Sequence, residues 1–215
     1  MTSINKDVWR IIDNDAAIRK NLVQGLINTS ALARKIAKEH HLDRNIDAVI
    51  SAIRRYEGSK EKKETLHTVY VLLKKAKLST RTKLVSVLLK KHEDIRKKLA
   101  TLYAKIDFSA GDTLRIFEVS TYIKLIIDDK NVLLVKSTFA ERDIVGITAK
   151  LGELCIDYQA DITKTPGLFA TLSNELAGND ISIVDSMICH NEHIIIVEEK
   201  NLERTFNVVF HLTHA

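Results

Sequence analysis

The sequence predicts an α+β protein, with helices in its first third and a repeated pattern of strands and helices after it. Apolar residues recur every three or four positions between residues 4 and 57, as they do on one face of a helix. From residue 80 onward, β-rich runs alternate with helical runs, and the order strand, helix, strand, strand, helix occurs twice. We therefore expect one helical domain followed by two βαββα passes.

Composition excludes several classes of function. The 215-residue chain is 45% hydrophobic and has seven glycines, none closer than six positions to the next. It therefore lacks the glycine-rich loops that bind dinucleotides and nucleoside triphosphates. Two cysteines cannot build a disulfide framework or a four-thiolate zinc site, so a reducing compartment fits. No apolar run approaches the ~18 residues of a membrane span, and the N-terminus carries acids where a signal peptide is apolar. We expect a cytoplasmic protein with no cofactor and no membrane partner.

Charge is distributed unevenly along the chain. Residues 1–77 hold 16 Lys/Arg and 9 Asp/Glu, a net +7, whereas residues 78–215 hold 17 and 19, a net −2. This favours a polyanion or an acidic partner for the first part and a different partner for the second.

The first third is expected to form short helices, over 4–12, 17–23, 29–41 and 45–57. Thr29 or Ser30 is suited to cap the third helix. The third and fourth helices, joined by a turn of about four residues, resemble the helix-turn-helix of winged-helix DNA-binding domains. The third is rich in alanine, which lets the fourth cross it closely, and the fourth ends in two arginines.

The resemblance implies that the exposed face of the fourth helix binds duplex DNA, through Arg44, Asn45, Ser51, Arg54 and Arg55. Two observations keep an alternative open. Asp47 lies on the same face, and no wing hairpin is visible before residue 66. The alternative is a packing or dimerisation module whose basic residues are simply solvated.

The first βαββα pass follows a helical connector. We expect a strand over 81–91 and a helix over 92–106. Two β-rich runs, 112–129 and 130–139, meet at the turn signal Asp-Asp-Lys-Asn and predict a hairpin. The run 141–153 is predicted to return to helix.

The second pass repeats this order, with a strand over 154–164, a helix over 165–179, a hairpin over 180–200 and a final helix over 201–212. The first hairpin is expected to be the longer one, so equivalent positions should keep no fixed offset. The second pass lacks the last strand of a ferredoxin-like βαββαβ unit. Another part of the chain, such as the first hairpin, or a second chain could supply it.

The second pass resembles an ACT domain, a small ligand-binding module of regulators and enzymes of amino-acid metabolism, on the run DITKTPGLFATLSNELAGNDISIVDSMI. The tandem arrangement is similar to the regulatory part of aspartate kinases. Pro166 and Gly167 predict a tight strand-to-helix turn, with Pro166 at the first helical position. The backbone N–H groups at the start of this helix would face outward and suit a carboxylate. In the first pass the run Lys-Lys-His-Glu-Asp at 90–94 replaces the proline and glycine.

The resemblance implies that an amino acid or similar small metabolite binds at an interface between modules. The implied contacts are Thr165, Pro166, Gly167, Leu168 and Phe169 on the turn, with Asn179, Asp180 and Ile181 at the start of the next strand. The alternative is that the turn is only a good helix start. Cys189, His190 and His193 also meet near one hairpin, but its arms should point the imidazoles apart, so we expect no metal site.

These patterns predict four parts: a helix-turn-helix-like domain (1–58), a helical linker (59–79), a first, degenerate ACT-like module (80–152) and a second ACT-like module (153–215). We expect a homodimeric, amino-acid-responsive regulator of transcription, in which the effector shifts the dimer geometry and so the spacing of two DNA-binding domains. The alternative is a ligand-sensing subunit of an enzyme of amino-acid metabolism that binds no nucleic acid. An enzyme is the least favoured reading, because no catalytic set is visible.

Overall fold

The computed structural model describes residues 4–23, 25–56 and 68–214 of the chain. The chain divides into two compact units, Met1–Leu66 and His67–Ala215. Each unit has hydrophobic clusters of its own.

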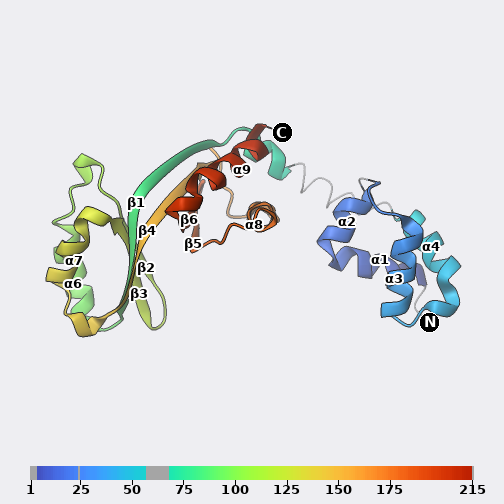
Figure 1. The fold of residues 1–215 in the computed structure, drawn as a ribbon, viewed down its shortest axis with the longest axis horizontal. Coiled ribbons are helices and arrows are strands. Elements are labelled where there is room, and N and C mark those ends of the chain that lie inside the picture. Colours follow the sequence, from blue (N-terminus) through green and yellow to red (C-terminus); the bar gives the residue numbers. More distant parts are fainter. Residues whose placement is uncertain (1–3, 24, 57–67, 215) are drawn as a thin grey trace. The chain divides into compact units, whose positions relative to one another are not determined.

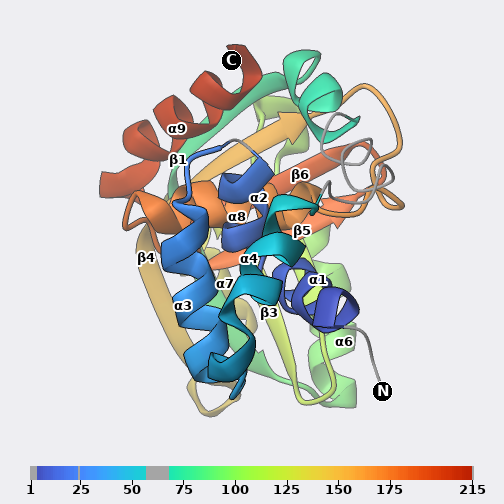
Figure 2. The same ribbon diagram turned by 90° about the vertical axis from the view of Figure 1, so that its right-hand side faces the viewer.

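The described part of the first unit is helical, as the periodicity predicts. Its α-helices are α1 (Ile4–Asn14), α2 (Ala16–Val23), α3 (Thr29–Glu39) and α4 (Ile46–Arg54), with the 3-10 turn η1 (Asp43–Asn45) before α4. Figure 2 shows α1, α3 and α4 gathered around one core. The buried side chains of that core are Val8, Ile12, Leu32, Ala33, Ile36, Val49, Ala52 and Ile53.

Small side chains and a few polar contacts hold these helices together. The prediction that α3 packs through alanines is confirmed at Ala33, which is fully buried. The Trp9 indole donates a hydrogen bond to the Ala52 carbonyl (2.9 Å), and the Tyr56 hydroxyl donates one to Asp13 (2.7 Å). Both bonds join α1 to α4 or its end, so they fix the crossing of the two helices.

Two local details of the first unit differ from the expectation. Asn28, rather than Thr29 or Ser30, caps α3, since its side-chain oxygen accepts a hydrogen bond from the Ala31 N–H (3.0 Å). The link between α3 and α4 spans 40–45 and contains a 3-10 turn, so it is longer than the four residues expected. Residues 57–67, where a wing hairpin could stand, lie outside the described residues.

The second unit is built on one antiparallel sheet. Its strands are β1 (Lys77–Lys90), β2 (Leu114–Glu118), β3 (Tyr122–Asp128), β4 (Ile144–Asp157), β5 (Asp185–Cys189) and β6 (Glu192–Glu198), in the spatial order β2-β3-β1-β4-β6-β5. Its named α-helices are α6 (Glu93–Tyr103), α7 (Val132–Thr138), α8 (Leu168–Gly178) and α9 (Leu202–His214), and residues 68–74 form a further helical segment.

The two long strands β1 and β4 run side by side through the whole unit (Figure 1). Each long strand has a second neighbour along only half of its length, β3 beside β1 and β6 beside β4. At the midpoint, Lys83 and Lys150 both have φ of 57° and the register between β1 and β4 shifts. Such single left-handed residues are typical of β-bulges, which bend a strand. The bulges divide the sheet into two half-sheets of the same design.

We define the first half-sheet as β2, β3, residues 84–90 of β1 and residues 144–150 of β4. The second half-sheet is β5, β6, residues 151–157 of β4 and residues 77–83 of β1. Each half thus has four strands in the order of a ferredoxin-like unit. The first half is continuous in the chain, from residue 84 to residue 150, whereas the second half takes its fourth strand from residues 77–83. The strand that the second pass lacked is therefore the start of β1, and the proposed boundary at 152/153 falls inside β4.

Three sequence interpretations were wrong in this unit. The run 130–139 is not a strand: it holds the 3-10 turn η3 (Asp129–Asn131) and α7, because Val135 packs into the core beneath it. The run 141–153 is mostly β4 and not a helix. The two hairpins pair over equal lengths, contrary to the expectation, and their equivalent residues are 70 positions apart. The expectation that the repeat keeps no single offset is confirmed, since β1 and β4 begin 67 residues apart and α6 and α8 begin 75 apart.

Helices cover one side of each half-sheet, and the other sides face each other. Helices α6 and α7 pack on the first half, and α8, α9 and 68–74 pack on the second. The opposite sides form one inner cluster, against which Phe117 of β2 and Met187 of β5 both pack although these strands lie at opposite edges of the sheet. The sheet is therefore curled onto itself.

Two ion pairs cross this inner space. Arg115 of β2 donates two hydrogen bonds of 2.6 Å to Glu153 of β4, and Lys124 of β3 donates one of 2.7 Å to Asp185 of β5. In a flat sheet, with strands ~4.8 Å apart, β3 and β5 would lie about 19 Å from each other. The contact between Lys124 and Asp185 is direct evidence of the curl.

Candidate functional site

The turn that the sequence singles out opens α8 at a corner of the second half-sheet. The loop before it is tied to the β5–β6 turn, since Tyr158 N–H donates to the Asn191 carbonyl and Ile162 N–H to the His190 carbonyl (both 2.9 Å). Asp157 accepts hydrogen bonds from Gln159 N–H (2.9 Å) and the Asn191 amide (2.7 Å), which lower the pKa of its carboxyl group. The helix start is thus held on a fixed frame.

Gly167 is the residue that shapes the corner. It is the N-cap of α8 with φ of 83°, a conformation that costs any side-chain-bearing residue ~1–2 kcal/mol. The helix begins at Leu168, so Pro166 lies before the cap and not at the first helical position as expected. No side chain caps α8, and its first turn holds no acid. Its first N–H groups are therefore available to an anion.

An apolar surface adjoins these N–H groups. Phe169 in the first turn is 48% exposed, and its ring lies 5.8 Å from that of His193 on β6. Ile188 on the edge strand β5 is the register partner of His193 and is also exposed. We name Gly167, Phe169, Ile188 and His193 the α8 corner.

His193 is the least expected member of this corner. It is 1% exposed, its Nε2 lies 2.8 Å from the Ser186 hydroxyl, and its buried Nδ1 has no hydrogen-bond partner among the described residues. Burial lowers the pKa of the imidazole to about 4, so the ring is neutral at neutral pH. The equivalent residue of the first half-sheet, 70 positions earlier, is the fully buried Ile123.

The matching corner of the first half-sheet is occupied by ion-paired and acidic side chains. Glu118, which is equivalent to Ile188, accepts hydrogen bonds from Lys91 (2.9 Å) and from Arg96 of α6. These cations lower the pKa of the Glu118 carboxyl. The first turn of α6 also carries two acids, Glu93 and Asp94, which disfavour a bound carboxylate. Only the second half therefore combines a free helix start with an apolar surface.

The structure separates the eight implied ligand contacts into two groups. Thr165, Pro166, Gly167 and Phe169 lie at the start of α8, where Leu168 is buried in the core. Asn179, Asp180 and Ile181 lie at its other end, and the expected strand start there is wrong because β5 begins at Asp185. At ~1.5 Å per residue, eleven residues of helix separate the groups by about 16 Å. One small ligand cannot touch both groups within one unit.

Residues 179–181 have a structural role in the chain itself. Asn179 donates from its side chain to the Glu175 carbonyl, and the N–H groups of Asp180 and Ile181 donate to carbonyls of the last turn of α8. They close the C-terminal end of the helix. Sequence reasoning missed Ile188 as a site residue and considered His193 only as a metal ligand. Strand geometry predicts that His193, Ile195 and Val197 share one side of β6, but the sequence does not indicate which side the helices cover.

The residues implied in nucleic-acid binding lie in the first unit. Arg44, Asn45 and Arg54 are exposed on η1 and α4. Arg55 is exposed too, but its guanidinium bonds the Ser51 hydroxyl (2.6 Å) and carbonyl (3.3 Å) of its own helix. The exposed side of α3 adds further cations, at Arg34, Lys35 and Lys38.

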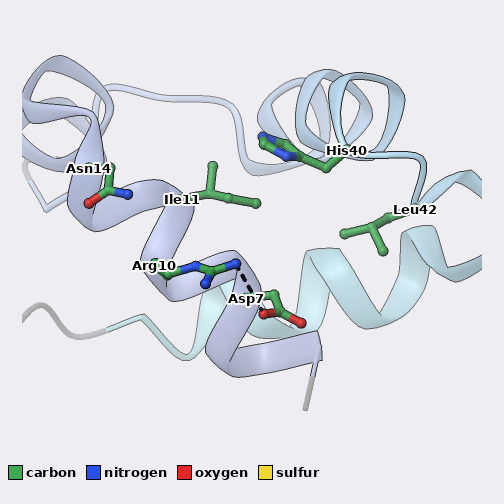
Figure 3. A pocket seen from close by; sticks show the side chains of 6 residues that line it. All are labelled: Asp7, Arg10, Ile11, Asn14, His40 and Leu42. Atoms are coloured by element: carbon green, nitrogen blue, oxygen red, sulfur yellow. Dashed lines mark ion pairs between the residues drawn. The ribbon is translucent and has the colours of Figure 1, made fainter. Parts of the chain in front are cut away.

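A shallow depression also lies in the first unit, between α1 and the turn after α3 (Figure 3). It has a volume of about 660 Å³ and is lined by Asp7, Arg10, Ile11, Asn14, His40 and Leu42. Arg10 and Asp7 pair with each other at 3.5 Å, so the charges at its rim are already compensated.

Two kinds of feature are missing from the part of the chain that the structure describes. No group of three or more His, Cys, Asp or Glu side chains there could hold a metal ion. None of the helices there is both long and apolar enough to cross a membrane.

Comparisons with known proteins show a fold and no family. No family model matches the chain, and no curated protein matches it. Among solved structures, the regulatory subunit of aspartate kinase from Thermus thermophilus, in a ligand-free form, aligns with a TM-score of 0.51 at 12% identity over 63% of this chain and 95% of that one. A structure of aspartokinase alpha and beta subunits aligns with a TM-score of 0.51 at 13% identity, over 64% of this chain and 97% of that one.

The aspartate kinase of Clostridium acetobutylicum, described as an allosteric enzyme, aligns with a TM-score of 0.52 at 13% identity over 64% of this chain. The present chain covers 34% of that enzyme, about a third of its length. These alignments show an α+β fold with a curled antiparallel sheet like that of aspartate kinase regulatory subunits, which the sequence predicted as ACT-like. They leave more than a third of the chain unmatched.

Proposed function

We propose that the second unit binds an amino acid or a similar small carboxylate at the α8 corner, and that the chain is a regulator controlled by this effector. The observation that carries the proposal is the difference between the two corners. Equivalent positions hold an ion-paired Glu118 in the first half-sheet and an exposed Ile188 in the second. The likeness of the fold to regulatory subunits of aspartate kinase supports it.

The chemistry of the corner suits such a ligand. The carboxylate would accept hydrogen bonds from the first N–H groups of α8, at the positive end of the helix. Thr165, Pro166 and Gly167 hold this turn, and Leu168 anchors it in the core. An apolar side chain of the ligand would lie against Phe169 and Ile188. Asn179, Asp180 and Ile181 could join only a ligand held between two copies of the unit, which is how we propose that they take part.

A thermal-shift experiment with each of the twenty amino acids tests this site. At 100 times its dissociation constant a ligand stabilises the folded state by ~2.7 kcal/mol, so a bound amino acid should raise the melting temperature by several degrees. Phe169→Ala should weaken the response. Phe108→Ala, which truncates an exposed aromatic residue outside the corner, is the matched control. No response to any amino acid would leave Gly167 as a structural turn.

We propose duplex DNA as the target of the first unit, through Arg44, Asn45, Ser51, Arg54 and Arg55. The exposed cations of η1 and α4, together with those of α3, support this output. In a homodimer the effector would change the spacing of the two first units, and thereby the affinity for DNA. The four-part division of the chain stays part of this proposal.

The second candidate is a sensing subunit of an enzyme of amino-acid metabolism. It is favoured by the comparisons, whose named proteins are regulatory subunits or whole aspartate kinases. The two outputs separate in a DNA-shift experiment at ~50 mM salt, where phosphate contacts are strongest. Arg54→Ala should weaken a shift, and Arg10→Ala, at an exposed arginine of α1, should not. Without any shift, the enzyme-subunit reading replaces the DNA reading.

A further inference from the structure

We infer that residues 144–150 of β4 pair with the same residues of a second copy of this chain and so form a homodimer. This run is the outer strand of the first half-sheet. On one side it pairs with β1. On the other side no described strand pairs with it, because β6 pairs only with residues Leu151–Asp157 of β4. It therefore presents a row of unpaired backbone N–H and C=O groups to any incoming strand.

The chain holds a second edge of the same geometry, which serves as an internal comparison. Residues 77–83 of β1 form the outer strand of the second half-sheet, where β3 pairs only with residues 84–90. The strands β1 and β4 begin at Lys77 and Ile144, so equivalent positions on the two edges are 67 residues apart. Both runs are exposed to solvent over nearly their whole length.

The two edges differ in their chemistry. The β1 edge reads KLSTRTK and carries three cations, Lys77, Arg81 and Lys83, which is how proteins protect an edge from unwanted pairing. The β4 edge reads IVGITAK and carries no charge before Lys150. Val145 and Ile147 on it are 47% and 38% exposed. An edge with a single charge at its end, no proline and exposed β-branched residues is suited to be covered by another strand.

The distribution of charged residues also favours a second copy of this chain as the strand that covers the β4 edge. If the β1 edge paired with itself in antiparallel fashion about Thr80, Lys77 would face Lys83, and about Ser79 it would face Arg81. Like charges opposite each other destabilise a sheet. If the β4 edge pairs with itself about Ile147, Lys150 faces Ile144 and no two charged residues face each other. The β4 edge is therefore compatible with its own copy, and the β1 edge is not.

Sedimentation of the full chain over a range of concentrations, without amino acid or DNA, measures the dimer. We expect twice the 24.3 kDa mass of one chain. Ile147→Lys should weaken dimerisation about tenfold or more, because it places two cations opposite or diagonal to each other across the axis. Thr80→Lys, at the equivalent position of the β1 edge, should leave the dimer unchanged within about twofold.

A mixture experiment distinguishes a lost interface from a damaged fold. Ile147→Lys and Ile147→Glu should each be weakened alone, and an equimolar mixture should recover a mixed dimer because the new charges then attract. A chain that is monomeric, a dimer that resists Ile147→Lys, or one that Thr80→Lys disrupts instead would each overturn the inference. Sedimentation is measured without an effector, so the absence of amino-acid binding in the thermal-shift screen would not affect the dimer measurement. In the same way, a monomeric chain would not change the outcome of the thermal-shift screen.

Discussion

Replacing Arg115 by methionine should destabilise the second unit strongly, because it leaves a charge buried without its partner. The Glu153 side chain is 1% exposed, and Arg115 supplies both of its short hydrogen bonds. Removing one partner of a buried ion pair costs ~3–5 kcal/mol. Arg81 stands 3.9 Å from Glu153 and is half exposed, so it can offset part of this loss. We therefore expect a loss of about 2–4 kcal/mol in the free energy of unfolding.

The assay is urea unfolding followed by two signals. Far-UV circular dichroism reports both units, whereas fluorescence reports the first, since the only tryptophan of the chain is Trp9. Arg115→Met should move the circular-dichroism transition of the second unit and leave the fluorescence transition in place. The double variant Arg115→Met/Glu153→Met should regain most of the loss, because apolar side chains of similar size often replace a buried pair without cost.

Two outcomes would refute this reasoning. If Arg115→Met unfolds within about 0.5 kcal/mol of the parent chain, Glu153 is hydrated or neutral and the pair does not hold the curled sheet closed. If the double variant is no more stable than the single one, the loss comes from the arginine's packing and not from the stranded carboxylate. Lys124→Met is the matched control: its pair with Asp185 is more exposed, so its loss should be smaller.

Three further predictions concern single residues of the same unit. His193→Ile should remove a pH dependence of the free energy of unfolding. The folded-state pKa of His193, about 4, lies below the usual 6.5, so the folded state keeps its full stability above pH 6.5 and loses stability as the pH falls toward 4. We expect this loss to be about 3 kcal/mol in unfolding measured as a function of pH. Gly152→Ala should lower the melting temperature by several degrees, because its Cβ would lie 2.8 Å from a leucine side chain of α9, whereas Gly146→Ala meets nothing within 4 Å. Gly167→Ala should cost ~1–2 kcal/mol in chemical unfolding through backbone strain alone, and Gly178→Ala, in α8, should not.

Periodicity predicts elements well where one face is buried and poorly where both faces meet solvent. The prediction of helices in the first unit is confirmed, since α1, α3 and α4 each bury one face. The second hairpin is also confirmed apart from its start, because β6 is a short continuous apolar run beside a local turn signal and is buried on both faces. The run 141–153 was read as a helix because residues 145–150 are exposed on both faces of β4 and show no alternation. The run 130–139 is predicted as a strand because its β-branched residues favour one, yet the packing of Val135 in the core stabilises a helix there.

The sequence predicts the candidate site only where its residues are adjacent in the chain. The turn at Pro166 and Gly167 is a local signal and was found. The partners that β5 and β6 bring to it, Ile188 and His193, depend on strand register and on which side α8 covers. Neither can be read before the register is known. The same holds for Arg115 and Glu153, which lie 38 residues apart and meet only because the sheet curls.

The distribution of charge on the inner face favours pairing of the two unlike half-sheets within one chain over pairing of either half with a copy of itself. The first half supplies the cations Arg115 and Lys124, and the second supplies the anions Glu153 and Asp185. Arg115 and Asp185 occupy equivalent positions, 70 residues apart. If two first halves packed together, Lys124 of one would meet Arg115 of the other. If two second halves did so, Asp185 would meet Glu153. Both alternatives oppose like charges in a buried place, so only the unlike halves fit. The symmetric edge of β4 is then left as the surface through which whole chains can associate without disturbing this pairing.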